Sequence, residues 1–279
     1  MSIELPEARI LADQLNDAIS GLTIETYDLK DFERMMKMGF INKDLTDFRS
    51  ILEKSVEKVL SRGNTIRVKL RDSMNLLIAP EYGGVISYLE SGDKIPKYHL
   101  RLTFNDDSMM TIRITSMGLV SAVSDENLKD SYMYKRDFLS GVSPDEPDFT
   151  VDWFKDTIGE ENRQLKPLLV GKEAHIIGVS NATFQDVIYR AEVHPKRKAS
   201  ELSEEELEGL YNAIKTVIND RLRLKGKTEF HDIYGEKGGY TPAMGPHMRD
   251  NKCPKCGTDI LRISHGGGHV YICPNCQPE

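Results

Sequence analysis

The residues with the clearest chemical potential are four cysteines near the C-terminus. They form two Cys-x-x-Cys pairs, Cys253 with Cys256 and Cys273 with Cys276, separated by sixteen residues. Each pair directs two thiolates toward one point, and two such pairs facing each other across a β-hairpin give a closed tetrahedral site. We therefore predict that these four residues bind one structural Zn²⁺ ion.

Two other uses of the cysteines remain open, a pair of disulfides or a redox-active Cys-x-x-Cys motif. His265 and His269 lie between the two pairs. Because four thiolates complete the coordination of zinc, we expect both histidines on the hairpin surface. Zinc ribbons serve nucleic-acid binding, protein contacts and plain stabilisation alike, so the motif identifies a metal and not a function.

Composition predicts a globular chain with two domains and a small appendix. The 279 residues are 39% hydrophobic and 29% charged. No apolar run approaches the ~18 residues of a membrane helix, and the N-terminus is charged where a signal peptide is apolar. We therefore expect a cytoplasmic protein with no membrane partner, and we also expect a monomer. The net charge of −7 argues mildly against the binding of nucleic acid. Residues 190–198 and 221–227 are basic, however, so local basic faces remain possible.

The first half of the chain has the pattern of a β domain preceded by a helix. Apolar residues at helical spacing predict a helix from about Glu7 to Ile19. Between about 22 and 123, short alternating runs predict an antiparallel sandwich or barrel, interrupted by a helix pair within 31–58. The runs lie at 65–70, 75–79, 85–89, 99–104, 110–114 and 120–123. Turns are expected at Arg71-Asp72, Gly83-Gly84, Ser91-Gly92 and Asn105-Asp106.

The second half has the pattern of a helical domain. The stretch 141–149 is rich in Pro, Gly and acidic residues and predicts a domain boundary. Ser203 and Glu206 form a predicted capping box at the start of the last helix, and residues 226–250, with five glycines, are predicted to form a loop. Helical periodicity is found at 150–160, 164–171, 181–191 and 203–224.

Four short motifs, in the same order, resemble the formamidopyrimidine-DNA glycosylase and endonuclease VIII family. Residues 3–7, Ile-Glu-Leu-Pro-Glu, resemble its Pro-Glu-Leu-Pro-Glu opening. Residues 178–181 and 193–195 resemble the Gly-Val-Gly-Asn and Ile-His-Pro of its helix-two-turns-helix domain. Lys166-Pro167 and the terminal Cys-x-x-Cys-Gln at 273–277 complete the pattern.

The resemblance implies an α+β fold and a DNA-repair function. The implied domains are an antiparallel β-sandwich with an N-terminal helix at 1–140, a helix-two-turns-helix domain at 150–225, a loop at 226–250, and a four-cysteine zinc finger at 251–279. Such a protein clamps kinked, damaged double-stranded DNA, excises oxidised bases and cleaves the abasic strand.

The resemblance also assigns roles to individual residues. Asn181 would contact a DNA phosphate, as would Lys166, and Asn64 stands where the family has a catalytic lysine on a hairpin. Glu4 and Glu7 match the family's acid/base residues. Alternatives remain open: a helix N-cap for Asn181, a solvated helix residue for Lys166, and favourable charge at a helix start for the two glutamates.

The predicted nucleophile differs from that of the family, which uses the amine of an N-terminal proline. The matching residue is Ile3, whose amide nitrogen cannot attack. If Met1 is removed, Ser2 offers a primary amine about 3.5 Å out of register. The arginine that the family carries on its zinc hairpin corresponds to a position near Gly268 in this chain. The family's loop that fills the gap left by a flipped base corresponds to about residues 115–119.

Three functions are compatible with these residues. The first is a repair enzyme of altered chemistry that uses Ser2 or an unrecognised lysine. The second is a catalytically inactive zinc-containing module that binds nucleic acid or protein. The third is a zinc protein of unrelated role that shares only the architecture.

Overall fold

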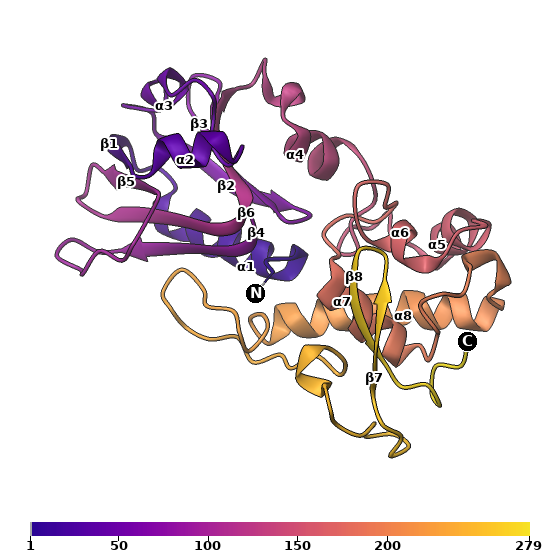
Figure 1. The fold of residues 1–279 in the computed structure, drawn as a ribbon. Coiled ribbons are helices and arrows are strands. Elements are labelled where there is room, and N and C mark those ends of the chain that lie inside the picture. The colour runs from indigo at the N-terminus through magenta and orange to yellow at the C-terminus, as the bar shows by residue number, and fades with distance from the viewer. Residues whose placement is uncertain (1) are drawn as a thin grey trace. The chain divides into compact units, whose positions relative to one another are not determined.

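A computed structural model describes residues 2–279, which fall into two compact units (Figure 1). The first unit combines Met1–Leu139 with Leu224–Gly239, and the second combines Ser140–Arg223 with Tyr240–Glu279. The chain therefore leaves the first unit and returns to it. Among residues 2–279, no helix has both the length and the apolar character needed to cross a membrane.

The first unit begins with helix α1 (Leu5–Ile19). Pro6 occupies its first turn, and Glu4 and Glu7 form a reciprocal capping box, in which Glu7 Oε2 accepts from the Glu4 N–H at 3.2 Å. The helix buries one apolar face, including Leu11 and Leu15, against strands β2 (Val56–Arg62) and β3 (Thr65–Leu70). The predicted N-terminal helix is confirmed.

The strands of the first unit form one six-stranded antiparallel sheet in the order β1-β5-β6-β4-β3-β2. They are β1 (Ile24–Leu29), β2 (Val56–Arg62), β3 (Thr65–Leu70), β4 (Met74–Leu89), β5 (Leu100–Phe104) and β6 (Met109–Ser124). The short helices are α2 (Phe32–Lys37), α3 (Thr46–Arg49), η1 (Leu128–Asp130), α4 (Tyr132–Tyr134) and η2 (Lys135–Leu139). The predicted α+β class and the helix pair within 31–58 are confirmed.

The predicted turn at Gly83-Gly84 is wrong, because both residues lie inside the 16-residue strand β4. Strands β4 and β6 pair along their whole length, with the register shifting around Tyr82. A Cβ on Gly84 would lie 2.2 Å from the Cβ of Pro80, so the bulge needs glycine for a close approach of two backbones. The two glycines therefore bend a strand instead of ending it.

The returning segment, residues 224–239, completes the core of the first unit. Phe230 and Ile233 are buried in the same apolar cluster as α1 and the sheet. The Tyr88 N–H donates to Ile233 O at 2.9 Å, and Gln14 Nε2 donates to Asp232 Oδ2 at 2.7 Å. The glycine-rich segment is thus irregular, as predicted, but firmly packed.

The second unit is helical and ends in a β-hairpin. Ser203 and Glu206 cap helix α8 reciprocally, at 3.2 and 2.8 Å, as predicted. The hairpin packs against helix α7 through β8 (Figure 1). The elements are α5 (Val151–Phe154), η3 (Lys155–Gly159), α6 (Leu165–Leu169), α7 (Asn181–Arg190), η4 (Ala199–Glu201), α8 (Glu204–Arg223), η5 (Pro246–Met248), β7 (Leu261–His265) and β8 (Gly268–Ile272).

Candidate metal centre and nucleic-acid interface

The four cysteines converge at the base of the β7–β8 hairpin. Their Sγ atoms all lie within 4.8 Å of one another. The Sγ distances are 3.8 Å from Cys253 to Cys276, 3.4 Å from Cys256 to Cys273 and 3.5 Å from Cys256 to Cys276. Sulfurs bonded at ~2.3 Å to a tetrahedral zinc are about 3.8 Å apart, whereas a disulfide needs ~2.05 Å. The thiolates hold one structural zinc ion, and the disulfide alternative is excluded.

Buried polar groups tie the metal centre to the rest of the second unit. The Tyr189 hydroxyl lies 3.3 Å from Cys253 Sγ. Gln277, fully buried, accepts from the Cys273 N–H at 3.0 Å and donates to Val193 O at 3.0 Å. Such outer contacts orient metal ligands. The hairpin is therefore held in one position by its metal and by the segment that follows α7.

Two residues predicted to bind DNA meet at this hairpin. Lys166 Nζ donates to His265 O at 2.7 Å, and Asn181 Nδ2 donates to His269 O at 3.0 Å. The Lys166 side chain is only 6% exposed, and burial lowers its pKa. Asn181 is the first residue of α7, and the N-cap is its neighbour Ser180, whose hydroxyl accepts from the Ala182 N–H at 3.4 Å. The structure thus places both residues beside the hairpin, Lys166 from α6 and Asn181 from the N-terminus of α7.

A second cluster gathers the predicted acid/base residues of the first unit around a lysine that sequence reasoning missed. Lys227 Nζ lies 2.9 Å from Ser2 O, 3.2 Å from Ser2 Oγ and 3.3 Å from Glu4 Oε2. Glu7 Oε1 accepts from the Lys227 N–H at 3.2 Å. Glu4 and Glu7 are fully buried, and the Lys227 side chain is 6% exposed. Ser2, Glu4 and Glu7 are therefore brought together, with Lys227 among them.

Asn64 belongs to a polar network in the first unit. Arg136 Nη2 donates to Asn64 Oδ1 at 2.6 Å, and the same guanidinium forms ion pairs with Asp137 and Glu81. Burial alone would lower the pKa of Arg136, but Asp137 and Glu81 raise it above its ordinary value. Glu81 O accepts from the Ile3 N–H at 3.1 Å. A cationic side chain therefore contacts Asn64, although it comes from a distant part of the sequence.

The residues around 115–119 form part of strand β6 instead of a separate loop. Met117 pairs with Tyr82 at the irregular part of β4, and the two side chains are 58% and 52% exposed. Gly268, the position that the resemblance matches to the family's hairpin arginine, is the first residue of β8 in the second unit. The first unit therefore presents two apolar side chains where the resemblance placed the gap-filling loop.

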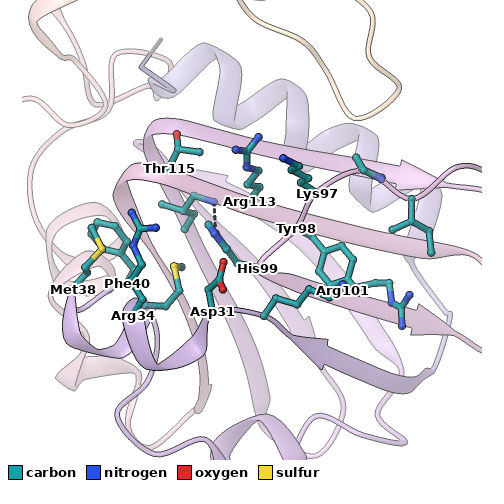
Figure 2. A pocket seen from close by; sticks show the side chains of 15 residues that line it. Asp31, Arg34, Met38, Phe40, Lys97, Tyr98, His99, Arg101, Arg113 and Thr115 are labelled. Atoms are coloured by element: carbon teal, nitrogen blue, oxygen red, sulfur yellow. Dashed lines mark hydrogen bonds between the residues drawn. The ribbon is translucent and has the colours of Figure 1, made fainter.

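A basic cavity of about 810 Å³ is the third cluster, and it also lies within the first unit (Figure 2). Its lining includes Arg34, Lys97 and Arg113, three cations for which the described part of the chain provides no ion-pair partner. Lys30 and Arg101 also line it, but they lie 4.6 and 5.4 Å from the ring of Tyr98. The excess of positive charge suits an anionic ligand.

His99 lies at the centre of this cavity in its neutral form. Burial lowers its pKa, and the charges of Arg113 and Arg34 act in the same direction, although Asp31 opposes them. Its Nδ1 accepts from the Ile114 N–H at 3.0 Å, as the dashed line in Figure 2 shows. The positive charge of the cavity therefore comes from its arginines and lysines.

Comparison with known proteins finds two matching family models and relatives that align with nearly the whole chain. Residues 140–231 match the model of the formamidopyrimidine-DNA glycosylase H2TH domain, and residues 250–278 match that of the zinc finger found in FPG and IleRS. The formamidopyrimidine-DNA glycosylase of Pelotomaculum thermopropionicum is 27% identical over 98% of both chains. The chain is similar to formamidopyrimidine-DNA glycosylases over nearly its whole length.

Solved structures of this glycosylase family share the fold over nearly the whole chain. Lactococcus lactis Fpg (MutM), in a complex with DNA that contains N7-benzyl-Fapy-dG, gives a TM-score of 0.84 at 20% identity, with 99% of this chain and 100% of that chain covered. A structure of MutM with DNA that contains carbocyclic 8-oxo-G gives 0.84 at 21% identity, with the same coverage. The glycosylase fold is therefore retained at low sequence identity.

Proposed function

We propose that this protein binds damaged double-stranded DNA and acts in base excision repair as a DNA glycosylase and abasic-site lyase for oxidised bases. Relatives named as formamidopyrimidine-DNA glycosylases align with 98% of the chain, and the solved relatives hold DNA with damaged bases or abasic sites. We further propose a monomer that works in the cytoplasm, with domains at 1–140, 150–225 and 251–279.

The observation that carries the DNA-binding proposal is the contact of Lys166 and Asn181 with the zinc hairpin. Both side chains donate to hairpin carbonyls, so the hairpin tip, a lysine and the N-terminus of α7 lie at one place. Backbone N–H groups at a helix N-terminus and a nearby ammonium are suited to bind phosphate. In this proposal Lys166 and Asn181 have two roles: they hold the hairpin beside the N-terminus of α7, and they contact DNA directly.

This proposal predicts selective binding to abasic DNA. A duplex with one tetrahydrofuran abasic analogue should bind at least about tenfold more tightly than the undamaged duplex, because a nucleotide lacking its base is less costly to extrude. Replacement of Lys166 by Met should weaken both complexes about tenfold, the equivalent of one lost charged contact of ~1.4 kcal/mol. Affinity is measured by fluorescence anisotropy at several salt concentrations.

The matched control is Lys172→Met, which changes an exposed lysine of the same unit. It should leave the affinity within about twofold of the native protein, since most surface substitutions have small effects. Equal affinity for intact and abasic duplexes, or no binding at low salt, contradicts the proposal.

We propose that the basic cavity of the first unit contributes a second phosphate contact. Simultaneous replacement of Arg34 and Arg113 by Gln should weaken binding to any duplex sequence and reduce the slope of log K against log salt by about 1 to 2, because each neutralised phosphate contributes ~0.9. The exposed Lys43, outside the cavity, is the control when replaced by Gln. An unchanged salt slope in the double variant excludes the cavity from the DNA interface.

A DNA-binding protein without catalysis is the second candidate function. Ile3 and Asn64 favour it, because neither supplies the amine that the resemblance assigns to its position. Borohydride trapping on abasic DNA separates the two candidates, since only an amine that forms a Schiff base becomes covalently attached.

A further inference from the structure

We propose that Lys227 supplies the amine nucleophile of this protein, with Glu4 as its acid/base partner. This inference rests on the proposed function, because it names the group that reacts with an abasic sugar. Lys227 lies in the segment that returns to the first unit, more than two hundred residues from Glu4 along the chain.

The position of Lys227 is fixed from both sides. Its N–H donates to Glu7 Oε1 at 3.2 Å, while Glu7 Oε2 accepts from the Glu4 N–H at 3.2 Å. One carboxylate thus joins the start of α1 to the backbone of residue 227. The carbonyl group of Lys227 is also closely packed. The Phe230 N–H donates to Lys227 O at 2.8 Å, and a Cβ on Gly238 would lie 2.5 Å from the same oxygen. The lysine backbone therefore has little freedom to move.

The side chain of Lys227 meets the requirements of an activated nucleophile. An amine is activated by a base within hydrogen-bond reach that is itself oriented by a third group. Here Nζ lies 3.3 Å from Glu4 Oε2, and Glu4 is held by its capping box with Glu7. As a stabilising ion pair alone this arrangement contributes little, because desolvation of two buried charges offsets their attraction.

The amine is covered by a partly exposed residue and not by the apolar core. Among residues 2–279, Nζ also lies 2.9 Å from the carbonyl oxygen and 3.2 Å from the hydroxyl oxygen of Ser2, which is only half-buried. Ser2 forms an isolated bridge with Tyr82, whose side chain is 52% exposed. For an abasic sugar to reach Nζ beside the Glu4 carboxylate, residue 2 must therefore move.

The reaction on an abasic site needs only these groups and water. Glu4 accepts a proton from the Lys227 ammonium, and the Nζ lone pair attacks the C1′ aldehyde carbon. Glu4 returns the proton, water leaves, and a C1′=Nζ iminium forms. The Glu4 carboxylate then removes a C2′ proton, the electron pair expels the 3′ phosphate as the C3′–O bond breaks, and Glu4 passes its proton to the departing phosphate. Water hydrolyses the conjugated imine and restores the amine, with no net oxidation or reduction.

The test is borohydride trapping on a duplex with one abasic site, followed by mass mapping of the adduct. In the native protein, the reduced adduct should lie on the peptide that contains Lys227. Lys227→Arg retains the charge but not the nucleophile, and Lys227→Met removes both. In each variant trapping should fall to background, while the affinity for the tetrahydrofuran analogue, which has no aldehyde, stays within about threefold of the native value.

Lys225→Arg is the matched control, because Lys225 is an exposed lysine two residues away. It should trap as the native protein does. An adduct on the N-terminal residue or on another lysine, or full trapping by Lys227→Arg, overturns the inference and leaves the repair function intact. Binding of the analogue without any trapping in the native protein also overturns it. Failure of the native protein to bind abasic DNA is the distinct result that removes the proposed function itself.

Discussion

Replacement of Cys273 by Ser should abolish zinc binding and unfold the C-terminal hairpin. Cys273 is fully buried, and its sulfur lies 3.4 Å from that of Cys256. Structural zinc sites in finger peptides have apparent binding free energies of about 10–16 kcal/mol at pH 7, which is also folding free energy for the segment that forms the site. The expected result is a fall from one zinc per chain to none, with loss of amide protection across β7 and β8.

Metal content is measured by a colorimetric zinc assay after thiol modification, and protection by hydrogen exchange. The controls are His265→Ala and His269→Ala, which should retain one zinc per chain because four thiolates complete the site. Full zinc content in Cys273→Ser, or its loss in either histidine variant, contradicts the four-thiolate assignment. DNA binding should fall together with zinc content, since Lys166 and Asn181 lose the hairpin carbonyls that they contact.

Replacement of Asp137 by Ala should strongly destabilise the first unit. The Asp137 side chain is fully buried, and it accepts from Thr65 Oγ1 at 2.5 Å and from Arg136 Nε and Nη2 at 2.6 and 2.7 Å. Removal of Asp137 leaves Arg136 with Glu81 as its remaining ion-pair partner within residues 2–279, and breaking a buried ion pair by removing one partner costs about 3–5 kcal/mol. The lost free energy of unfolding is measured by urea denaturation followed by circular dichroism.

The comparison of Asp137→Asn with Asp137→Ala separates the effect of the carboxylate charge on stability from the effect of the side chain's size and hydrogen bonds. Asn retains the size and one accepting oxygen, so it should lose less than Ala. The exposed Asp130, in η1 of the same region, is the control, and its replacement by Ala should change stability by less than about 0.5 kcal/mol. A loss below about 1 kcal/mol in Asp137→Ala contradicts the view that the contacts of this buried carboxylate with Thr65 and Arg136 stabilise the first unit.

The elements that sequence predicted best are those whose signals are local. Helix α8 begins with a capping box at Ser203 and Glu206, and the zinc site is defined by two Cys-x-x-Cys pairs, so both were predicted with the correct residues. Helix α1, whose apolar face has a clear helical period, was predicted to begin two residues later than it does, at Glu7 instead of Leu5. In these cases a few neighbouring residues determine the structure.

The elements that sequence missed depend on distant contacts. Strand β1 has only one buried residue, Ile24, so its alternation is too weak to recognise. Gly83 and Gly84 have the composition of a turn, but the packing of Gly84 on Pro80 makes them a bulge within β4. No local pattern marks these positions as part of a sheet.

In the candidate site, too, residues in a local motif were predicted, whereas residues that only the fold brings together were missed. Glu4 and Glu7 were identified from a short motif, and they lie together as the helix start requires. Lys227 lies in a glycine-rich segment that resembles an ordinary loop, and only the fold brings it to Glu4. Arg136 likewise reaches Asn64 across more than seventy residues of sequence. Long-range pairings of this kind leave no periodicity in a single sequence.

The return of residues 224–239 to the first unit restricts how this protein can be cut or recombined. A fragment that ends at Leu139 would lack Phe230 and Ile233, two side chains of its own apolar interior, and would also lack Lys227. A fragment that carries only the later part of the chain would expose the same two side chains to solvent. The two units are therefore interleaved along the chain instead of modular, and an exchange of parts between relatives must transfer both segments of the first unit together.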